Sequence, residues 1–152
     1  VIVINNHLES IGLSPEDKAN FKGVVKGNIK GDSAQISTKT LIKKLGEASS
    51  IRAAQADAIA QYIAAHRDKS VILCGDFNDT PLSYTYRQLS RKLTDSFIEK
   101  GRGIGNTYIG EFPSFRIDYV LHSPTLYTVG YIREDITLSD HYPIKVKIRK
   151  GS

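Results

Sequence analysis

The chain has 152 residues, of which 40% are hydrophobic and 24% charged, and this composition excludes disordered and fibrous proteins. Lysine and arginine outnumber aspartate and glutamate by 21 to 16, and the resulting net charge of +5 favours phosphate-bearing or other anionic partners. The single cysteine, Cys74, excludes an internal disulfide and a cysteine-based zinc site. The length suits one domain or a large part of one.

Hydrophobic spacing predicts helices interleaved with strands. The expected elements, in chain order, are a buried strand at 1–4, helices at 15–21, near Leu41 and at 50–67, a strand at 71–74, a helix at 84–93, and strands at 116–122, 126–133 and 141–149. The helix at 50–67 has the clearest amphipathic pattern, and its polar side includes Arg52. This order predicts a layered α/β fold in which helices cover at least one face of the sheet.

No apolar run approaches the ~20 residues that a membrane-spanning helix requires. The chain opens directly in VIVI without a methionine, so we expect any signal peptide to lie upstream of it. The sequence therefore assigns no compartment.

Four polar clusters fall where predicted strands begin or end. They are Asn5-x-His7, Gly75-Asp76-Phe77-Asn78, Arg116-Ile117-Asp118-Tyr119 and Ser139-Asp140-His141. Each cluster alone is more typical of an ordinary turn or a hydrogen-bonded structural residue. Four together are a stronger signal, because strand ends are where open sheets commonly place active sites.

These clusters contain the side chains that phosphodiester hydrolysis requires. The three aspartates offer oxygen ligands for a hard divalent cation and a carboxylate that can orient water, and the two histidines can transfer protons. The aspartates are Asp76, Asp118 and Asp140, and the histidines are His7 and His141. The sequence has no HExxH, no GxxxxGK[ST] and no GxSxG motif, which excludes the zinc proteases, P-loop NTPases and serine hydrolases that carry them.

In their order and spacing, the runs NxHL, GDFN, RIDYV and SDHYP resemble the signature series of the endonuclease/exonuclease/phosphatase superfamily, whose members hydrolyse phosphoesters with Mg²⁺ or a similar ion such as Mn²⁺. The resemblance spans nearly the whole chain, from Asn5 to Pro143. It implies a four-layer α/β/β/α sandwich with a mixed, mostly antiparallel sheet flanked by helices.

The resemblance also implies roles for individual residues. Asp76 would orient or deprotonate the attacking water, and Asn78 beside it would hold the phosphate. Asp118 would orient His141, whose imidazole would contact the scissile phosphate. The remaining implied roles are a second phosphate-facing imidazole at His7, metal binding by Asp140 with Asp76, and substrate contacts at Asn5 and Thr107.

Residues 1–152 would form the carboxy-terminal part of one such domain, because the family's amino-terminal half carries an asparagine and a metal-binding glutamate that have no counterpart here. We therefore expect the isolated chain to hydrolyse little and to self-associate through the face that the other half would cover. The substrate stays open among nucleic acids, lipid head groups and inositol phosphates. The alternative is a non-catalytic phosphate- or nucleic-acid-binding module of the same fold.

Overall fold

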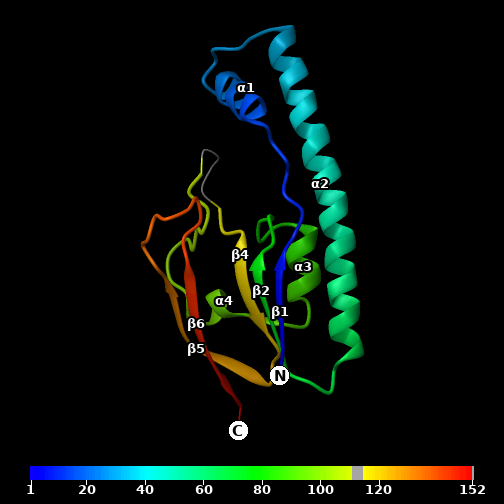
Figure 1. Ribbon diagram of the computed structural model, residues 1–152, viewed down its shortest axis with the longest axis vertical. Coiled ribbons are helices and arrows are strands. Elements are labelled where there is room, and N and C mark those ends of the chain that lie inside the picture. The colour runs from blue at the N-terminus through cyan, green and yellow to red at the C-terminus, as the bar shows by residue number, and fades with distance from the viewer. Residues whose placement is uncertain (111–114, 152) are drawn as a thin grey trace.

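The computed structural model describes residues 1–110 and 115–151. Its elements in chain order are β1 (Ile2–His7), α1 (Pro15–Val25), α2 (Asp32–Ala65), β2 (Val71–Asp76), α3 (Tyr84–Ser90), β3 (Thr94–Asp95), α4 (Ser96–Lys100), β4 (Asp118–His122), β5 (Leu126–Arg133) and β6 (Ile144–Lys150). None of the helices in these ranges is long and apolar enough to cross a membrane. Figure 1 shows two parts, which we call the sheet body and the helical arm; the arm consists of α1 and residues 32–46 of α2.

The main sheet has the strand order β1-β2-β4-β3, and β5 pairs with β6 in a second sheet. β1 and β2 run parallel, whereas the other strand pairs are antiparallel. The mixed, mostly antiparallel arrangement with flanking helices confirms the fold class predicted from the sequence.

The hydrophobic core lies between the main sheet and the helices α2 and α3. Leu73 and Leu121 are neighbours in the β2–β4 register and are fully buried on the helix-facing side of the sheet. The other buried members of the core are Leu8, Ala56, Phe77, Tyr86, Leu89, Leu93 and Tyr119. Because these residues come from both ends of the sheet body, the core fixes the strands that carry the polar clusters.

Local sequence explains where the shorter helices begin. Ser14 caps α1 by accepting the Asp17 N–H at 3.1 Å, while the Asp17 carboxylate accepts the Ser14 N–H at 2.8 Å, which is a complete capping box. Ser83 caps α3 in a similar way by accepting the Tyr86 N–H at 3.1 Å. The predicted start of each helix is confirmed, although α1 continues to Val25 and α3 ends at Ser90.

Three expectations about the elements were wrong. The short helix near Leu41 and the helix at 50–67 are parts of one helix, α2, which has 34 residues. Val3 is 65% exposed, so the first strand is not buried on both faces. Arg52, assigned to the polar side of its helix, is only 4% exposed. The short elements β3 and α4 were not predicted, because runs of a few residues carry no detectable periodicity.

Candidate active site

Three strands bring polar side chains to the same edge of the main sheet. β1 and β2 end at His7 and Asp76, which are paired in the parallel register, and β4 begins at Asp118 directly opposite Asp76. Paired residues in neighbouring strands point to the same face of a sheet, so all three side chains project from one face. Figure 1 shows these strand ends below the helical arm.

A loop preceding β6 brings the fourth polar cluster to this edge. The Ile109 N–H donates to the Asp140 carbonyl at 2.8 Å, and the Tyr142 N–H donates to the Thr107 carbonyl at 2.7 Å. These two bonds hold His141 between two anchored neighbours. The ring of Tyr108 packs edge-on against the His141 imidazole, with 5.3 Å between the ring centroids. The loop is therefore fixed on both sides of the histidine.

His141 forms a carboxylate–imidazole pair with Asp118. Its Nδ1 lies 2.8 Å from Asp118 Oδ2, and its Nε2 lies 3.9 Å from Asp76 Oδ2. Burial alone would lower the pKa of His141, but the hydrogen bond and the negative charge of Asp118 outweigh it, so the pKa is raised above its ordinary value. The pair thus favours a protonated imidazole whose Nε2 points toward Asp76.

Asp76 lies between the two histidines. Its Oδ2 is 3.7 Å from His7 Nε2, and its Oδ1 accepts the Asn78 N–H at 2.7 Å. Burial raises the pKa of Asp76, and the negative charge of Asp118 adds to this effect, while the bond from Asn78 and the imidazoles oppose it. A carboxylate with a raised pKa is a better proton acceptor.

The turn after β2 needs special backbone geometry. Gly75 has a φ of 132°, and a Cβ at this position would lie 1.9 Å from the Asn6 carbonyl oxygen, so a side chain does not fit. Asn78 has a φ of 50°, and its Nδ2 donates to the Leu8 carbonyl at 2.9 Å. This bond ties the turn to the end of β1 and uses one of the two protons of the Asn78 amide group. The phosphate contact that the resemblance implies for Asn78 stays a prediction.

A cavity of about 790 Å³ opens over this edge of the sheet. Six of the predicted site residues line it, namely His7, Asp76, Asn78, Asp118, Asp140 and His141. The structure does not bring Asn5 and Thr107 into the cavity. Asn5 is exposed beside Cys74, whereas Thr107 is fully buried and its hydroxyl accepts the N–H groups of Ile117 and Asp118 at 3.1 Å. Their substrate-binding roles stay predictions.

Sequence reasoning missed a buried arginine beneath the cavity. Arg52 Nε donates to Asp79 Oδ2 at 3.1 Å, and its Nη1 donates to the Glu9 carbonyl at 3.0 Å. Gln55 Oε1 accepts the Glu9 N–H at 2.9 Å, so α2 holds this residue by both of its backbone groups. The network connects α2 to the segments that follow β1 and β2. The sequence hints at this network through Asp79, which directly follows GDFN and is the acid that Arg52 pairs with.

A comparison with protein-family models matches residues 30–141 to the endonuclease/exonuclease/phosphatase family. The chain belongs to this family. The match includes three of the four polar clusters, and it confirms the resemblance inferred from the motifs. A search of curated proteins gave no match.

Solved structures with the family's fold agree. An endonuclease/exonuclease/phosphatase family protein from Bacteroides thetaiotaomicron is 22% identical, with a TM-score of 0.57 over 66% of this chain and 45% of that one. A mannosyl-6-phosphatase from the same species is 23% identical, with a TM-score of 0.52 over 68% of this chain and 46% of that one. The human Nocturnin catalytic domain with bound sulfate is 19% identical, with a TM-score of 0.55 over 67% of this chain and 42% of that one. The chain thus spans less than half the length of the structures that it matches.

The donor set at the strand ends fits a hard divalent cation. One ligand atom each from Asp76, Asp118 and His141 lies within 4.8 Å of the others. Mg²⁺ in proteins is usually held by one or two carboxylates together with water and substrate phosphate, and two of these three residues are carboxylates. The carboxylate of Asp140, which the sequence assigned to the metal, is exposed at the rim of the cavity and is not part of this group.

Proposed function

We propose that this chain carries the proton-transfer part of a metal-dependent phosphoester hydrolase in which water attacks phosphorus. The observation that carries the proposal is the His141–Asp118 pair at 2.8 Å, with Asp76 facing the other ring nitrogen across the same cavity. A carboxylate and a carboxylate-paired imidazole that face one cavity are the arrangement that acid–base hydrolysis needs.

The chain's own residues divide this chemistry between them. Asp76 would accept the proton of the attacking water. His141, whose Nδ1–H donates to Asp118, would present its Nε2–H to a phosphate oxygen and stabilise the charge that develops there. His7 is exposed at the cavity, where it would contact the phosphate from the side of β1.

Asp76 and Asp118 would hold the divalent cation, with Asp140 at the rim available to its water ligands. Mg²⁺ or Mn²⁺ bound there would stabilise negative charge on the phosphate. We further propose that chain outside residues 1–152 supplies the remaining ligands of the site, since two carboxylates are few for such a cation. The isolated chain would then bind the cation weakly and hydrolyse little.

The test is hydrolysis of bis(p-nitrophenyl) phosphate with Mg²⁺ or Mn²⁺, measured for this chain and for a longer protein that contains it. In the longer protein, Asp76→Asn, Asp118→Asn and His141→Ala should each lower kcat by about 10²–10⁴-fold. Asp135→Asn is the matched control, because this exposed carboxylate lies outside the cavity. Full activity in all three variants would refute the proposal. Absence of hydrolysis in the longer protein would favour the non-catalytic binding module, and fast hydrolysis by the isolated chain would refute the divided site.

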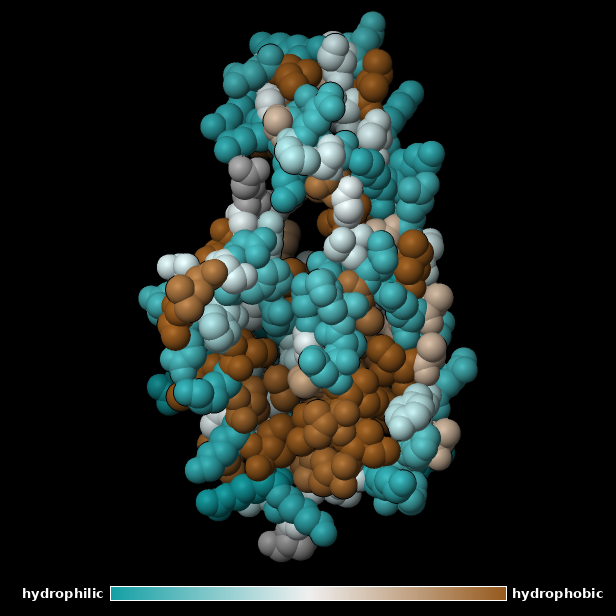
Figure 2. All heavy atoms as spheres, in the orientation of Figure 1, coloured by the Kyte–Doolittle hydropathy of each residue, from teal (hydrophilic) through white to brown (hydrophobic). Residues whose placement is uncertain are grey.

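A second expected property is self-association through the main sheet. Val1 and Val3 are 77% and 65% exposed on the sheet face that also carries Ile72, Cys74 and Val120 in the register. Figure 2 shows a broad hydrophobic area over this part of the sheet body. Since exposed apolar faces of this kind associate in water, we expect dimers in sedimentation velocity at high concentration, and Val3→Lys should shift them to monomers. A monomeric wild-type protein would contradict this expectation.

A further inference from the structure

A second cavity lies at the opposite end of the sheet body from the candidate active site. We call it the basal pocket; it is enclosed by the carboxy-terminal ends of α2 and α3 and by residues 123–125, and its volume is about 860 Å³. β2 starts there at Val71 and ends in the active site at Asp76, a span of about 17 Å at the usual rise of a strand. The two cavities are therefore separate sites.

The basal pocket has an apolar floor of a size suited to a small molecule. The half-buried Ile63 and Ala64 and the exposed Pro124 offer apolar surface that a ligand can reach, above the buried side chains of Val71, Leu89 and Leu93. Ligand sites in proteins typically enclose about 300–1,000 Å³ and combine apolar walls with a few polar groups. The cavity fits that description, and the proposed hydrolysis uses none of its residues.

Its rim is cationic, and the positive charge is only partly neutralised. Four basic side chains line the rim: Arg67, Lys69, Arg91 and Lys92. Within the described residues, none of them forms an ion pair with an acid. The lining also has two carboxylates, and the one of Asp57 accepts hydrogen bonds from the neutral groups of Tyr84 and Gln88 at 2.7 Å, so the basic side chains outnumber the acidic ones by four to two. The rim therefore keeps a net positive potential.

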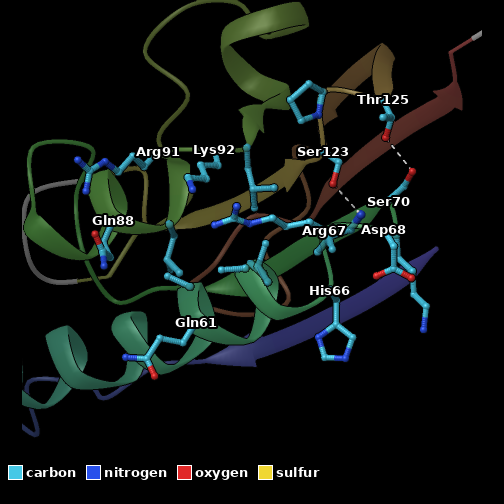
Figure 3. A pocket seen from close by; sticks show the side chains of 18 of the residues that line it. Gln61, His66, Arg67, Asp68, Ser70, Gln88, Arg91, Lys92, Ser123 and Thr125 are labelled. Atoms are coloured by element: carbon cyan, nitrogen blue, oxygen red, sulfur yellow. Dashed lines mark hydrogen bonds between the residues drawn. The ribbon is translucent and has the colours of Figure 1, made fainter.

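The orientation of the side chains brings two of these cations, Arg67 and Lys92, toward each other, whereas Arg91 points outward. Figure 3 shows the Arg67 side chain reaching across the pocket toward Lys92, while the second carboxylate, Asp68, points away from it. Ser123 Oγ accepts the Val71 N–H at 2.8 Å, which leaves its own proton free to donate. Two cations facing each other repel, and an anion between them would replace that repulsion with two charge-assisted hydrogen bonds.

A simpler explanation exists for these cations. Both α2 and α3 end at the pocket, and basic residues near the carboxy terminus of a helix stabilise its dipole. That role predicts an effect of Arg67 on protein stability but none on ligand affinity, so the two explanations are separable by experiment.

We propose that the basal pocket binds an organic phosphate, with the phosphate group between Arg67 and Lys92 and the apolar group on the floor, where Ile63, Ala64 and Pro124 are accessible. A guanidinium binds phosphate through paired N–H donors, and the ammonium group of a lysine adds a second charge. This activity goes beyond the proposed hydrolysis and does not depend on it.

The test is an amide-shift titration by NMR of the chain with phenylphosphonate, which a phosphatase cannot hydrolyse, in the presence of EDTA. We expect saturable shifts at residues 67–71 and 123–125, and at least tenfold weaker affinity for inorganic phosphate, which cannot use the apolar floor. Shifts confined to the surroundings of His7 and His141 would overturn the proposal without touching the hydrolase assignment, as would equal affinity for inorganic phosphate.

Charge-neutralising variants complete the test. Arg67→Gln and Lys92→Gln change exposed side chains, so folding should be retained, and together they should weaken phenylphosphonate binding at least tenfold. The matched control is Lys147→Gln with Arg149→Gln, which removes two exposed cations from β6 and should leave affinity within twofold. Equal losses of affinity in the two pairs of variants would indicate a general effect of net charge. Unchanged affinity with lower stability in the Arg67→Gln and Lys92→Gln pair would mean that Arg67 only stabilises the end of the helix. Either result would overturn the proposed site.

Discussion

The two halves of α2 behave as different kinds of helix. Residues 47–65 include the buried side chains Ala48, Arg52 and Ala56 and lie against the sheet body, whereas residues 32–46 bury none, and Ile36 and Ile42 there are 65% and 62% exposed. Figure 1 shows the amino-terminal half extending beyond the sheet with only α1 beside it. One continuous helix thus passes from a packed environment into an open one.

This contrast indicates where stability and function lie. Helices owe most of their stability in proteins to tertiary packing, which the half of α2 on the sheet body has and which the helical arm has only between α1 and α2. The Arg52 network that supports the active-site segments also belongs to the packed half. We therefore expect changes in the body to affect the whole protein and changes in the helical arm to remain local.

The largest effect should come from Arg52→Ala. It would leave Asp79, whose side chain is only 15% exposed, without its ionic partner, and breaking a buried ion pair typically costs about 3–5 kcal/mol. We expect a loss near ~3 kcal/mol in urea denaturation, because Asp79 keeps some contact with water. Lys39→Ala, an exposed cation in the arm half of the same helix, should change stability by less than about 0.5 kcal/mol.

The double variant Arg52→Met with Asp79→Asn separates charge from packing. Removing both charges should recover part of the loss, since no unpaired carboxylate remains. Similar losses for Arg52→Ala and Lys39→Ala would contradict the contrast between the two halves of α2.

An intermediate effect is expected at Gly46, where the helical arm joins the packed half of α2. A Cβ at this position meets no atom within 4 Å, and a helical glycine costs roughly 0.5–1 kcal/mol relative to alanine. Gly46→Ala should therefore stabilise the helix by about that amount and slow amide exchange on both sides of the junction. Gly23→Ala is the contrasting variant, because a Cβ there would lie 2.6 Å from Ile29. Faster amide exchange around the junction in Gly46→Ala would show that α2 needs a flexible residue there.

The same contrast explains what the sequence could predict. The longer strands and the polar clusters at their ends were predictable, because β-branched runs and turn residues act locally. In the arm half of α2 only a short helix near Leu41 was predicted, and its full length was missed, since Ile36, Ile42 and Leu45 never form a buried stripe that would reveal it. Burial of Arg52 and of Thr107 also escaped prediction, because each depends on partners far along the chain, Asp79 for one and the Asp118 N–H for the other.

The smallest effect concerns the contact that holds α1 to α2. Hydrogen bonds from Lys44 and Ser14 lower the pKa of Asp17 to about 2 from an ordinary 3.8. A lowered carboxyl pKa stabilises the folded arm above pH 3.8, and this contribution is lost as the pH falls through about 2.

Lys44→Gln should raise the pKa of Asp17 toward 3.8, as measured by NMR titration of its carboxyl carbon, and should speed amide exchange in α1 without affecting β2. Lys43→Gln removes the same charge one residue away, where the lysine pairs with Glu47 instead, and should leave Asp17 nearly unchanged. Equal shifts in both variants would mean that the general positive field of α2, and not the direct contact with Lys44, holds the helical arm together.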